Sequence, residues 1–210
     1  MSVINEGSNP DKYIYINQNS LHEMVCQEII EQFESEATEK KDGVVFAGMI
    51  KNVKDTTDHV IEIDDRKWDN IRVLLANELK YNLNRYANQV NNNIDYKSSN
   101  NHSNEKDFIV LNPKSLVYST FMIQKYQSNK GRYIYHNDFR FTDDKYRVLT
   151  YLWYLNDVEI GGETAFNGDY KIKPETGKLI LFPATWTYPH CGKMPLSGNK
   201  YIITGWLYSK

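Results

Sequence analysis

The chain has 210 residues, 40% of them apolar and 25% charged, with a formal net charge of −2. This length suits one domain, and the composition is that of an ordinary globular protein, without the basic excess of a general nucleic-acid binder. The polar first ten residues lack the apolar segment of a secretory signal, and no apolar run approaches the length of a membrane span. The two cysteines, Cys26 and Cys191, are too few for a disulfide framework. We therefore expect a cytoplasmic chain with neither a nucleic acid nor a membrane as partner.

Residues 12–107 predict a helix-rich region, which starts with a short strand at 13–16. Ser20 and Glu23 stand at the spacing of a capping box, and apolar residues then recur at helical spacing as far as Phe33. We therefore expect a first helix that begins at Ser20.

A second and longer helix is expected to begin at Asp64 or Asp65. From Trp68 to Val90 the apolar residues keep the 3.6-residue period for about six turns. The segments around this helix are expected to be an apolar, extended run at 44–50, a polar loop at 51–59, a short strand at 60–63 and an Asn/Ser-rich loop at 91–107.

From residue 108 onward the pattern changes to short extended runs separated by turn residues. The strand at 148–155 carries bulky apolar side chains on both faces, which indicates that both faces are covered, the outer one by the helices of the first half. We therefore expect one domain, 1–210, in which residues 12–107 support a β-sandwich or barrel formed by residues 108–210. The expected strands are 121–126, 133–139, 148–155, 170–172, 178–182 and 200–208.

His136 and Asp138 stand two positions apart in one of these strands, so their side chains point to the same side and can bind one ion. His190, which follows a loop with two prolines, can supply a third ligand. Two histidines and one carboxylate on one face of a metal are typical of non-haem Fe(II) oxygenases, whereas zinc more often takes three or four His or Cys ligands. A His-x-Asp pair also occurs by chance at a solvated surface, so the pair alone does not decide. The remaining histidines, expected on a helix surface or in loops, are His22, His59 and His102.

Lys200 opens an apolar strand on which Ile202, Thr204 and Trp206 share its face. A lysine on an inward face is costly unless an anion meets it, and a carboxylate-bearing ligand would do so through a charge-assisted hydrogen bond. The alternative is a lysine at the end of a strand whose ammonium reaches water. The residues by themselves leave both interpretations open.

With these residues in this order, the sequence resembles the Fe(II)/2-oxoglutarate-dependent oxygenases, specifically their prolyl 4-hydroxylase-like branch. The resemblance is strongest in Tyr154-Leu-Asn-Asp-Val-Glu-Ile-Gly-Gly-Glu-Thr-Ala-Phe166, a near match to the family pattern. It departs after Lys200, where Tyr201 and Gly205 replace a tryptophan and a lysine of the collagen-type pattern. The other matching residues are Tyr126, Gly131, Tyr133, His136, Asp138, Arg147, Pro174, Gly177, Ile180, Phe182, His190, Gly192, Pro195, Gly198, Lys200 and Trp206.

This resemblance implies a mainly β fold with packed helices around a double-stranded β-helix, a jelly-roll or cupin-like core. It further implies that His136, Asp138 and His190 hold Fe(II). Lys200 would pair with the distal carboxylate of 2-oxoglutarate, and Tyr154 would hydrogen-bond the same carboxylate. Further residues near the co-substrate, the oxygen or the substrate would be Tyr126, Thr150, Thr204 and Trp206.

The activity implied by the resemblance is that of a dioxygenase. It would use Fe(II), 2-oxoglutarate and O2 to hydroxylate an unactivated C–H bond, releasing succinate and CO2, with ascorbate as a stimulant. The preferred substrate is a prolyl residue in a peptide or protein. One alternative keeps the cofactors and acts on a free amino acid or small metabolite; another, of a different class, is a non-catalytic metal-binding β-barrel used for interaction. Residues 44–63 and 91–107 are the expected cover for the substrate, although the first half carries no clear peptide-binding signature.

Overall fold

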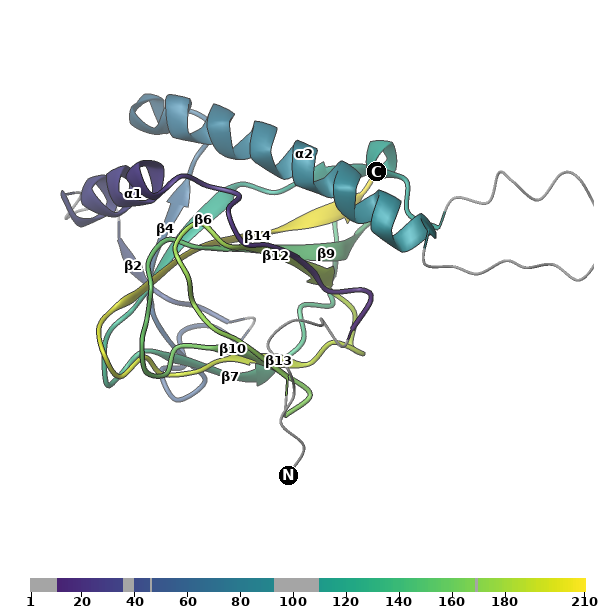
Figure 1. Cartoon of the computed structure of the whole chain (residues 1–210). Helices are drawn as coiled ribbons and strands as arrows, with labels where there is room; N and C mark the ends of the chain where they lie inside the picture. The colour runs from purple at the N-terminus through teal and green to yellow at the C-terminus, as the bar shows by residue number, and fades with distance from the viewer. Residues whose placement is uncertain (1–10, 36–39, 46, 93–109, 169) are drawn as a thin grey trace, which may run out of the picture.

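A computed structural model describes residues 11–35, 40–45, 47–92, 110–168 and 170–210. Two antiparallel β-sheets face each other, and both long helices lie against the outer face of the larger sheet (Figure 1). The prediction of a mainly β fold with helices packed outside a double-stranded β-helix is confirmed. The assignment of residues 1–210 to a single domain stays a prediction. None of the helices in the described ranges is long and apolar enough to cross a membrane.

The larger sheet has nine strands, and its long central pair is β9 (Lys145–Tyr154) and β14 (Lys200–Ser209). Two short strands lie off the main path, with β5 paired to β14 and β8 paired to β9. The order along the main path is β1 (Tyr15–Asn17), β12 (Leu179–Pro183), β9, β14, β6 (Phe121–Tyr126), β4 (Thr57–Ile61) and β2 (Lys41–Asp42), and the two off-path strands are β5 (Leu116–Tyr118) and β8 (Phe141–Thr142).

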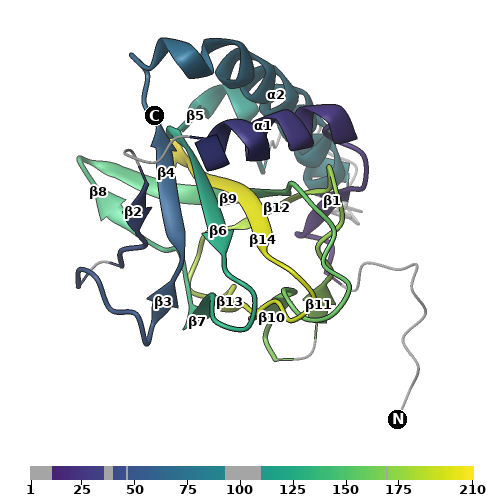
Figure 2. The same ribbon diagram turned by 90° about the vertical axis from the view of Figure 1, so that its left-hand side faces the viewer.

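The smaller sheet has five strands and lies on the opposite side of the larger sheet from the helices (Figure 1). Its order is β11 (Tyr170–Ile172), β10 (Thr164–Phe166), β13 (His190–Gly192), β7 (Arg132–His136) and β3 (Lys54–Asp55). Strands from the first half of the chain therefore stand in both sheets. Figure 2 shows the two strands β3 and β4, with β3 beside β7 in the smaller sheet and β4 beside β6 in the larger sheet.

The core is divided between the two faces of the larger sheet. On the outer face, apolar residues of the two long helices pack with the outward side chains of β9 and β14, among them Trp153 and Ile203. On the inner face, Leu152, Tyr154 and Ile202 form a second cluster that faces the smaller sheet. The alternation along β9 confirms that both of its faces are covered. The helices are α1 (Glu23–Ser35), η1 (Arg66–Trp68), α2 (Asp69–Asn92) and η3 (Pro113–Ser115).

The expected start of the first helix at Ser20 is wrong, because α1 begins at Glu23. His22 takes the capping role, since its Nδ1 accepts the backbone N–H of Met24 at 3.2 Å. The Ser20 hydroxyl instead accepts the indole N–H of Trp153 at 2.9 Å. A buried indole donor needs an acceptor, and this tertiary demand outweighs the local capping pattern.

The segment between the two long helices also differs from the prediction. The described residues of 44–50 form no strand, since Val45 and Gly48 pair only as an isolated bridge. The expected polar loop at 51–59 contains β3 and most of β4, and four of its polar side chains are buried rather than solvated: Lys54, Thr56, Asp58 and His59. His59, expected at the surface, is 3% exposed, and its ring lies 5.3 Å from that of Trp68. His102 and most of the loop at 91–107 lie outside the described residues.

Candidate metal centre

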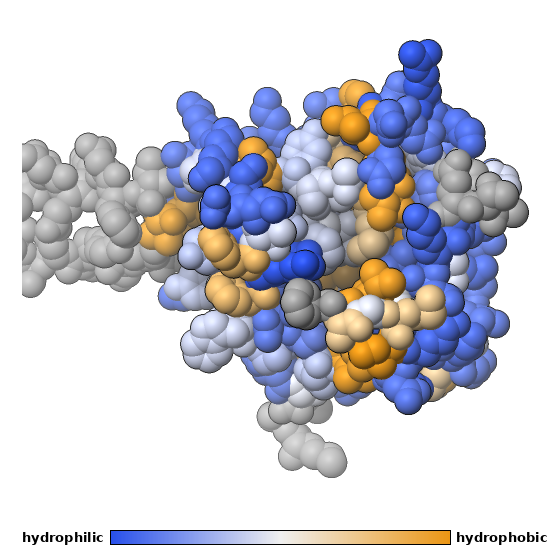
Figure 3. Space-filling view, turned by 180° about the vertical axis from the view of Figure 1, so that it is seen from behind, coloured by the Kyte–Doolittle hydropathy of each residue, from blue (hydrophilic) through white to orange (hydrophobic). Residues whose placement is uncertain are grey.

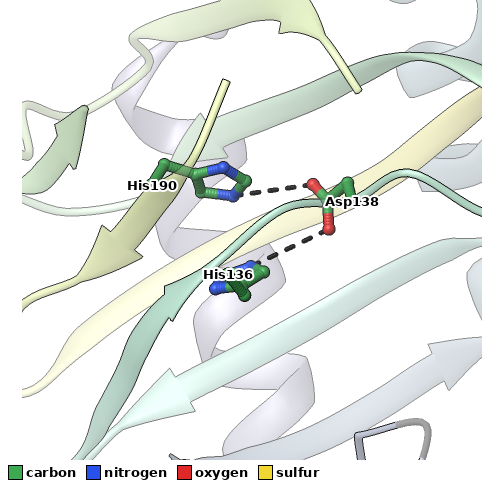
Figure 4. Close-up of side chains that lie close together, drawn as sticks. All are labelled: His136, Asp138 and His190. Carbon is green, nitrogen blue, oxygen red and sulfur yellow. Dashed lines mark ion pairs between the residues drawn. The ribbon is translucent and has the colours of Figure 1, made fainter. Parts of the chain in front are cut away.

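Two histidines and one aspartate converge on the side of the smaller sheet that faces the larger sheet (Figure 4). His136 ends β7 and His190 begins β13, and the two residues are direct partners in the sheet. The Asp138 carboxylate faces both rings, with Oδ1 3.8 Å from His136 Nε2 and Oδ2 3.5 Å from His190 Nε2. One ligand atom from each residue lies within 4.8 Å of the others, which is the spacing that one metal ion requires.

Two details of this arrangement correct the sequence analysis. The strand expected at 133–139 ends at His136, so Asp138 does not share a pleated face with it. Asp138 reaches the site because the chain turns after β7, where the Asn137 side chain accepts the backbone N–H of Phe139 at 3.1 Å. The expected strands also include none at residues 190–192, whereas His190 begins β13, which completes the sheet between β7 and β10.

Both imidazole rings are held in the orientation that a metal ligand needs. Nδ1 of His136 lies 2.8 Å from the carbonyl oxygen of Ile134, and Nδ1 of His190 lies 3.0 Å from that of Tyr188. A carbonyl oxygen only accepts, so each Nδ1 carries the proton and each Nε2 presents its lone pair toward Asp138. Tyr133 stacks on His136, with ring centroids 3.5 Å apart and an interplanar angle of 13°.

The electrostatics of the three side chains suit a cation. Burial, together with the charge of His190, lowers the pKa of His136 to about 4, so this ring is neutral near pH 7. Burial by itself raises the pKa of Asp138, but the two histidines and a hydrogen bond from Thr150 outweigh it, so the net pKa lies below its ordinary value. Two imidazoles that direct Nε2 at the site and one carboxylate form a donor set that fits Fe(II) and leaves other coordination positions open.

A cavity of about 650 Å³ lies between the two sheets, with the three residues on one wall and Lys200 on the other. Lys200 is 1% exposed, which excludes the alternative that its ammonium reaches water. Its Nζ donates to the carbonyl oxygen of Gly162 at 2.9 Å and lies 3.8 Å from the ring centroid of Tyr126. Burial lowers the pKa of Lys200 to about 7, against the opposing charge of Glu163. A buried cation with a neutral hydrogen-bond acceptor is the arrangement expected of an anchor for an anion.

Of the other residues that the resemblance indicated, four line the cavity and one, Tyr154, does not. Tyr126, Thr150, Thr204 and Trp206 line the same cavity as Lys200 and the three candidate ligands. The cavity wall does not include Tyr154, whose hydroxyl donates to Thr164 Oγ1 at 2.6 Å, so it acts on the cavity through Thr164.

Two threonines in the cavity have their hydroxyls engaged by the protein. The Thr150 hydroxyl donates to Asp138 Oδ2 at 2.7 Å, which orients the carboxylate rather than a co-substrate. The Thr204 hydroxyl donates to the carbonyl oxygen of Tyr151 at 3.0 Å.

Two groups of cavity residues were missed by the sequence analysis. The first is Arg147, noted only as a motif residue, whose guanidinium carbon lies 3.5 Å from the ring centroid of Trp206. The second consists of Lys54, Asp58 and Gln124, which form a hydrogen-bonded group on the wall beside Tyr133. No sequence signal marks the second group, because every residue from 54 to 58 is polar, so the pattern does not distinguish the face toward the cavity from the opposite face.

Apolar side chains surround the mouth of the cavity. Val44 of the first half and Phe139 and Phe141 of the second line the cavity and are 60%, 49% and 54% exposed. Figure 3 shows hydrophobic groups gathered around a hollow on this side of the molecule. The cavity therefore opens to solvent through a rim that carries exposed apolar surface.

Part of the chain matches the model of a known protein family. Residues 121–208 match the family model described as the 2OG-Fe(II) oxygenase superfamily. No curated protein matches the chain in sequence.

Solved structures share the fold at low sequence identity. The viral collagen prolyl hydroxylase of Paramecium bursaria Chlorella virus-1, solved with 2OG, is 18% identical with a TM-score of 0.63; the match covers 94% of this chain and 97% of that chain. The Trichoplax adhaerens prolyl hydroxylase, in complex with a hypoxia inducible factor oxygen degradation domain peptide fragment, is 20% identical with a TM-score of 0.65, over 94% and 84%. A Pseudomonas putida prolyl-4-hydroxylase is 13% identical with a TM-score of 0.61, over 94% and 93%. Residues 121–208 therefore match the model of the 2OG-Fe(II) oxygenase superfamily, and the chain shares its fold with these prolyl hydroxylases.

Proposed function

We propose that the protein is an Fe(II)- and 2-oxoglutarate-dependent dioxygenase that hydroxylates a prolyl residue within a peptide or protein and releases succinate and CO2. His136, Asp138 and His190 would hold the iron. When bound, the iron would supply the activation of O2 by 2-oxoglutarate, a redox step for which amino acid side chains have no equivalent. The protein's own part is to place the ligands, the co-substrate and the reacting C–H bond.

The residues around the candidate ligands have two tasks. The carbonyl oxygens of Ile134 and Tyr188 keep a proton on each Nδ1, so that both Nε2 atoms remain available. The Thr150 hydroxyl holds one oxygen of Asp138 and leaves the other directed toward His136. These contacts fix the ligands before any metal binds, which reduces the cost of ordering them.

Lys200 would bind the distal carboxylate of 2-oxoglutarate. Its ammonium lies in the cavity and donates to the Gly162 carbonyl oxygen, a neutral acceptor, so a carboxylate would supply a close counter-charge. The Tyr126 ring under the ammonium and the Thr164 hydroxyl at the wall would complete this end of the site.

The observation that carries the choice of a polypeptide substrate is the open, apolar mouth of the cavity. A site for a free amino acid is expected to close around it and to offer partners for both its carboxylate and its ammonium group. Here the mouth is wide, and at its inner end Arg147 and Trp206 form a flat surface with hydrogen-bond donors. The buried Nε1 of Trp206 has no hydrogen-bond partner among the described residues, so a peptide carbonyl oxygen could satisfy it. A proline ring is apolar and compact, which suits the face of the indole.

The decisive experiment measures succinate formation with Fe(II) and 2-oxoglutarate across a panel of proline-containing peptides, followed by mass spectrometry for added oxygen on proline. We expect peptide-dependent succinate, increased by ascorbate, and a mass increase of one oxygen. Turnover with free amino acids but with no peptide would favour the metabolite hydroxylase. Metal binding without succinate under any substrate, in a folded protein, would favour the non-catalytic binding module.

A further inference from the structure

A single carboxylate of the first half, Asp58, gathers three side chains at the cavity wall. Its Oδ2 accepts the Lys54 ammonium at 2.6 Å and the Gln124 amide at 3.2 Å, and its Oδ1 accepts the Thr56 hydroxyl at 2.7 Å. All four residues are less than 9% exposed. None of Lys54, Thr56 and Asp58 belongs to the segment that matches the family model.

One branch of this group leads to the candidate metal ligands. The Lys54 ammonium lies 5.5 Å from the ring centroid of Tyr133, within the range of a cation–π contact. Tyr133 in turn stacks on the ring of His136 at 3.5 Å. The position of Lys54 therefore influences the position of the Tyr133 ring, which packs against the candidate ligand His136.

The other branch leads to the candidate anchor of the co-substrate. Gln124, held by Asp58 through its amide N–H, accepts the Tyr126 hydroxyl on its Oε1 at 3.4 Å. The Tyr126 ring lies under the Lys200 ammonium at 3.8 Å. Asp58 is thus joined to both ends of the site through two intermediate side chains on each path.

The backbone explains why one residue can reach both ends. β3 pairs with β7 in the smaller sheet and β4 pairs with β6 in the larger sheet, and only Thr56 separates β3 from β4 (Figure 2). The chain crosses from one sheet to the other beside the cavity, and the Lys54–Asp58 ion pair spans this crossing. Gly43 packs directly on it, since a Cβ there would lie 2.1 Å from Thr56 Oγ1, so the crossing has no room to shift.

We propose that Asp58 is a positioning residue that sets, through Lys54 and Gln124, the placement of both the metal ligand His136 and the co-substrate anchor Lys200. This inference rests on the proposed function, because it takes Fe(II) and 2-oxoglutarate as the ligands of the two ends. A buried ion pair is a weak source of stability, since an apolar pair of similar size often serves as well. Partners behind metal ligands, by contrast, commonly change affinity when they are altered.

The test is Asp58→Asn, measured by anaerobic calorimetry of Fe(II) binding, and of 2-oxoglutarate binding to the Fe(II)-loaded protein, well below the Tm. We expect both affinities to fall about 10-fold, the lower end of the loss seen when a partner behind a ligand is removed. Asn82→Ala is the matched control, because Asn82 is equally buried and bonded but holds Tyr15, Asn17 and Ser20 on the helical side. It should lower the Tm and leave both affinities unchanged.

A second variant keeps the inference open to refutation if Asp58→Asn folds poorly. Lys54→Met with Asp58→Leu removes the whole ion pair, which should restore the Tm toward that of the wild type while both affinities stay weak. Wild-type affinities in either Asp58 variant would overturn the positioning role. That failure differs from failure of the proposed function, in which the wild-type protein itself would form no succinate from 2-oxoglutarate.

Discussion

The two walls of the cavity meet their ligands in different ways. On the smaller sheet, Asp138 faces two imidazoles and accepts a hydrogen bond from Thr150, so its carboxylate is held in place by the protein. On the larger sheet, Lys200 is also buried but hydrogen-bonds a neutral carbonyl oxygen, and burial lowers its pKa to about 7. The candidate metal ligands are thus preformed, whereas the proposed anchor of the co-substrate is a cation that lacks a close counter-charge.

The difference identifies Lys200 as a residue whose burial lowers the free energy of unfolding and favours the binding of an anion. Depressing the pKa of a lysine from 10.5 to about 7 corresponds to roughly 5 kcal/mol of destabilisation below neutral pH. A bound carboxylate would recover much of that loss as affinity. We therefore expect changes at the metal end to act on the reaction, and changes at Lys200 to act on binding and stability in opposite directions.

The largest effect is expected at the metal end. His190→Ala removes one of three candidate ligands, and we expect succinate formation to fall by more than the ~100-fold that loss of a partner behind a ligand can cost. The measurement is succinate release under saturating 2-oxoglutarate, with circular dichroism as the check that the fold persists. Retention of more than a tenth of the activity would contradict the assignment of His190.

The second largest effect is expected at Lys200, and it distinguishes the roles of the two cavity walls most directly. Lys200→Met keeps the length of the side chain without its charge, so 2-oxoglutarate affinity should fall about 100-fold, as for the loss of a buried charge-assisted bond worth roughly 3 kcal/mol. The same change removes an uncompensated buried cation, so the Tm of the ligand-free protein should rise by several degrees. Fe(II) affinity should stay as in the wild type. A lowered Tm together with unchanged 2-oxoglutarate affinity would mean that Lys200 is only a structural residue.

The pH dependence sharpens the same contrast. Because the pKa of Lys200 in the free protein is about 7, its protonated fraction falls as pH rises above 7, and 2-oxoglutarate affinity should weaken by about tenfold per pH unit there. The unfolded chain holds this proton up to pH 10.5, so the contribution of Lys200 to stability rises between pH 7 and 10.5. Calorimetry from pH 6 to 9, on the wild type and on Lys200→Met, measures the first effect, and the variant should show no such slope.

The smallest effect is expected at the mouth. Trp206→Phe removes the indole N–H but keeps an aromatic face, so the KM for a proline-containing peptide should rise about 5-fold to 10-fold, as for one hydrogen bond. The Kd for 2-oxoglutarate should not change, because Lys200 is intact. If the variant altered the Kd and spared the KM, Trp206 would belong to the co-substrate end instead.

Six of the ten strands that the structure describes in the second half could be predicted, because apolar residues mark their faces. The runs at 121–126 and 200–208 match β6 and β14 to within a residue, and the bulk on both faces of 148–155 correctly indicated cover on both sides. The candidate ligands and Lys200 could also be named from the sequence, since their order and spacing repeat a family pattern. In these places local pattern and tertiary structure agree.

The segment at 54–58 could not be predicted, because all of its residues are polar and the sequence shows no alternation of apolar and polar side chains there. Its inward face carries Lys54, Thr56 and Asp58 rather than apolar residues, because it faces a polar cavity instead of the core. A polar face that is buried has the same sequence pattern as one that is solvated. Only the contacts with Gln124 and Tyr133, which come from distant parts of the chain, distinguish the two.

The sequence by itself determined the two-sided burial of the central strands, the identity of the three candidate ligands and the lysine that completes the site. Only the tertiary structure decided that Asp138 reaches the site from beyond the end of β7, that Thr150 holds its carboxylate, and that Asp58 joins both walls. The physical reason is that hydrophobic periodicity reports burial against an apolar core. The partners of a buried polar group are set by the packing of two sheets, and no local pattern records them.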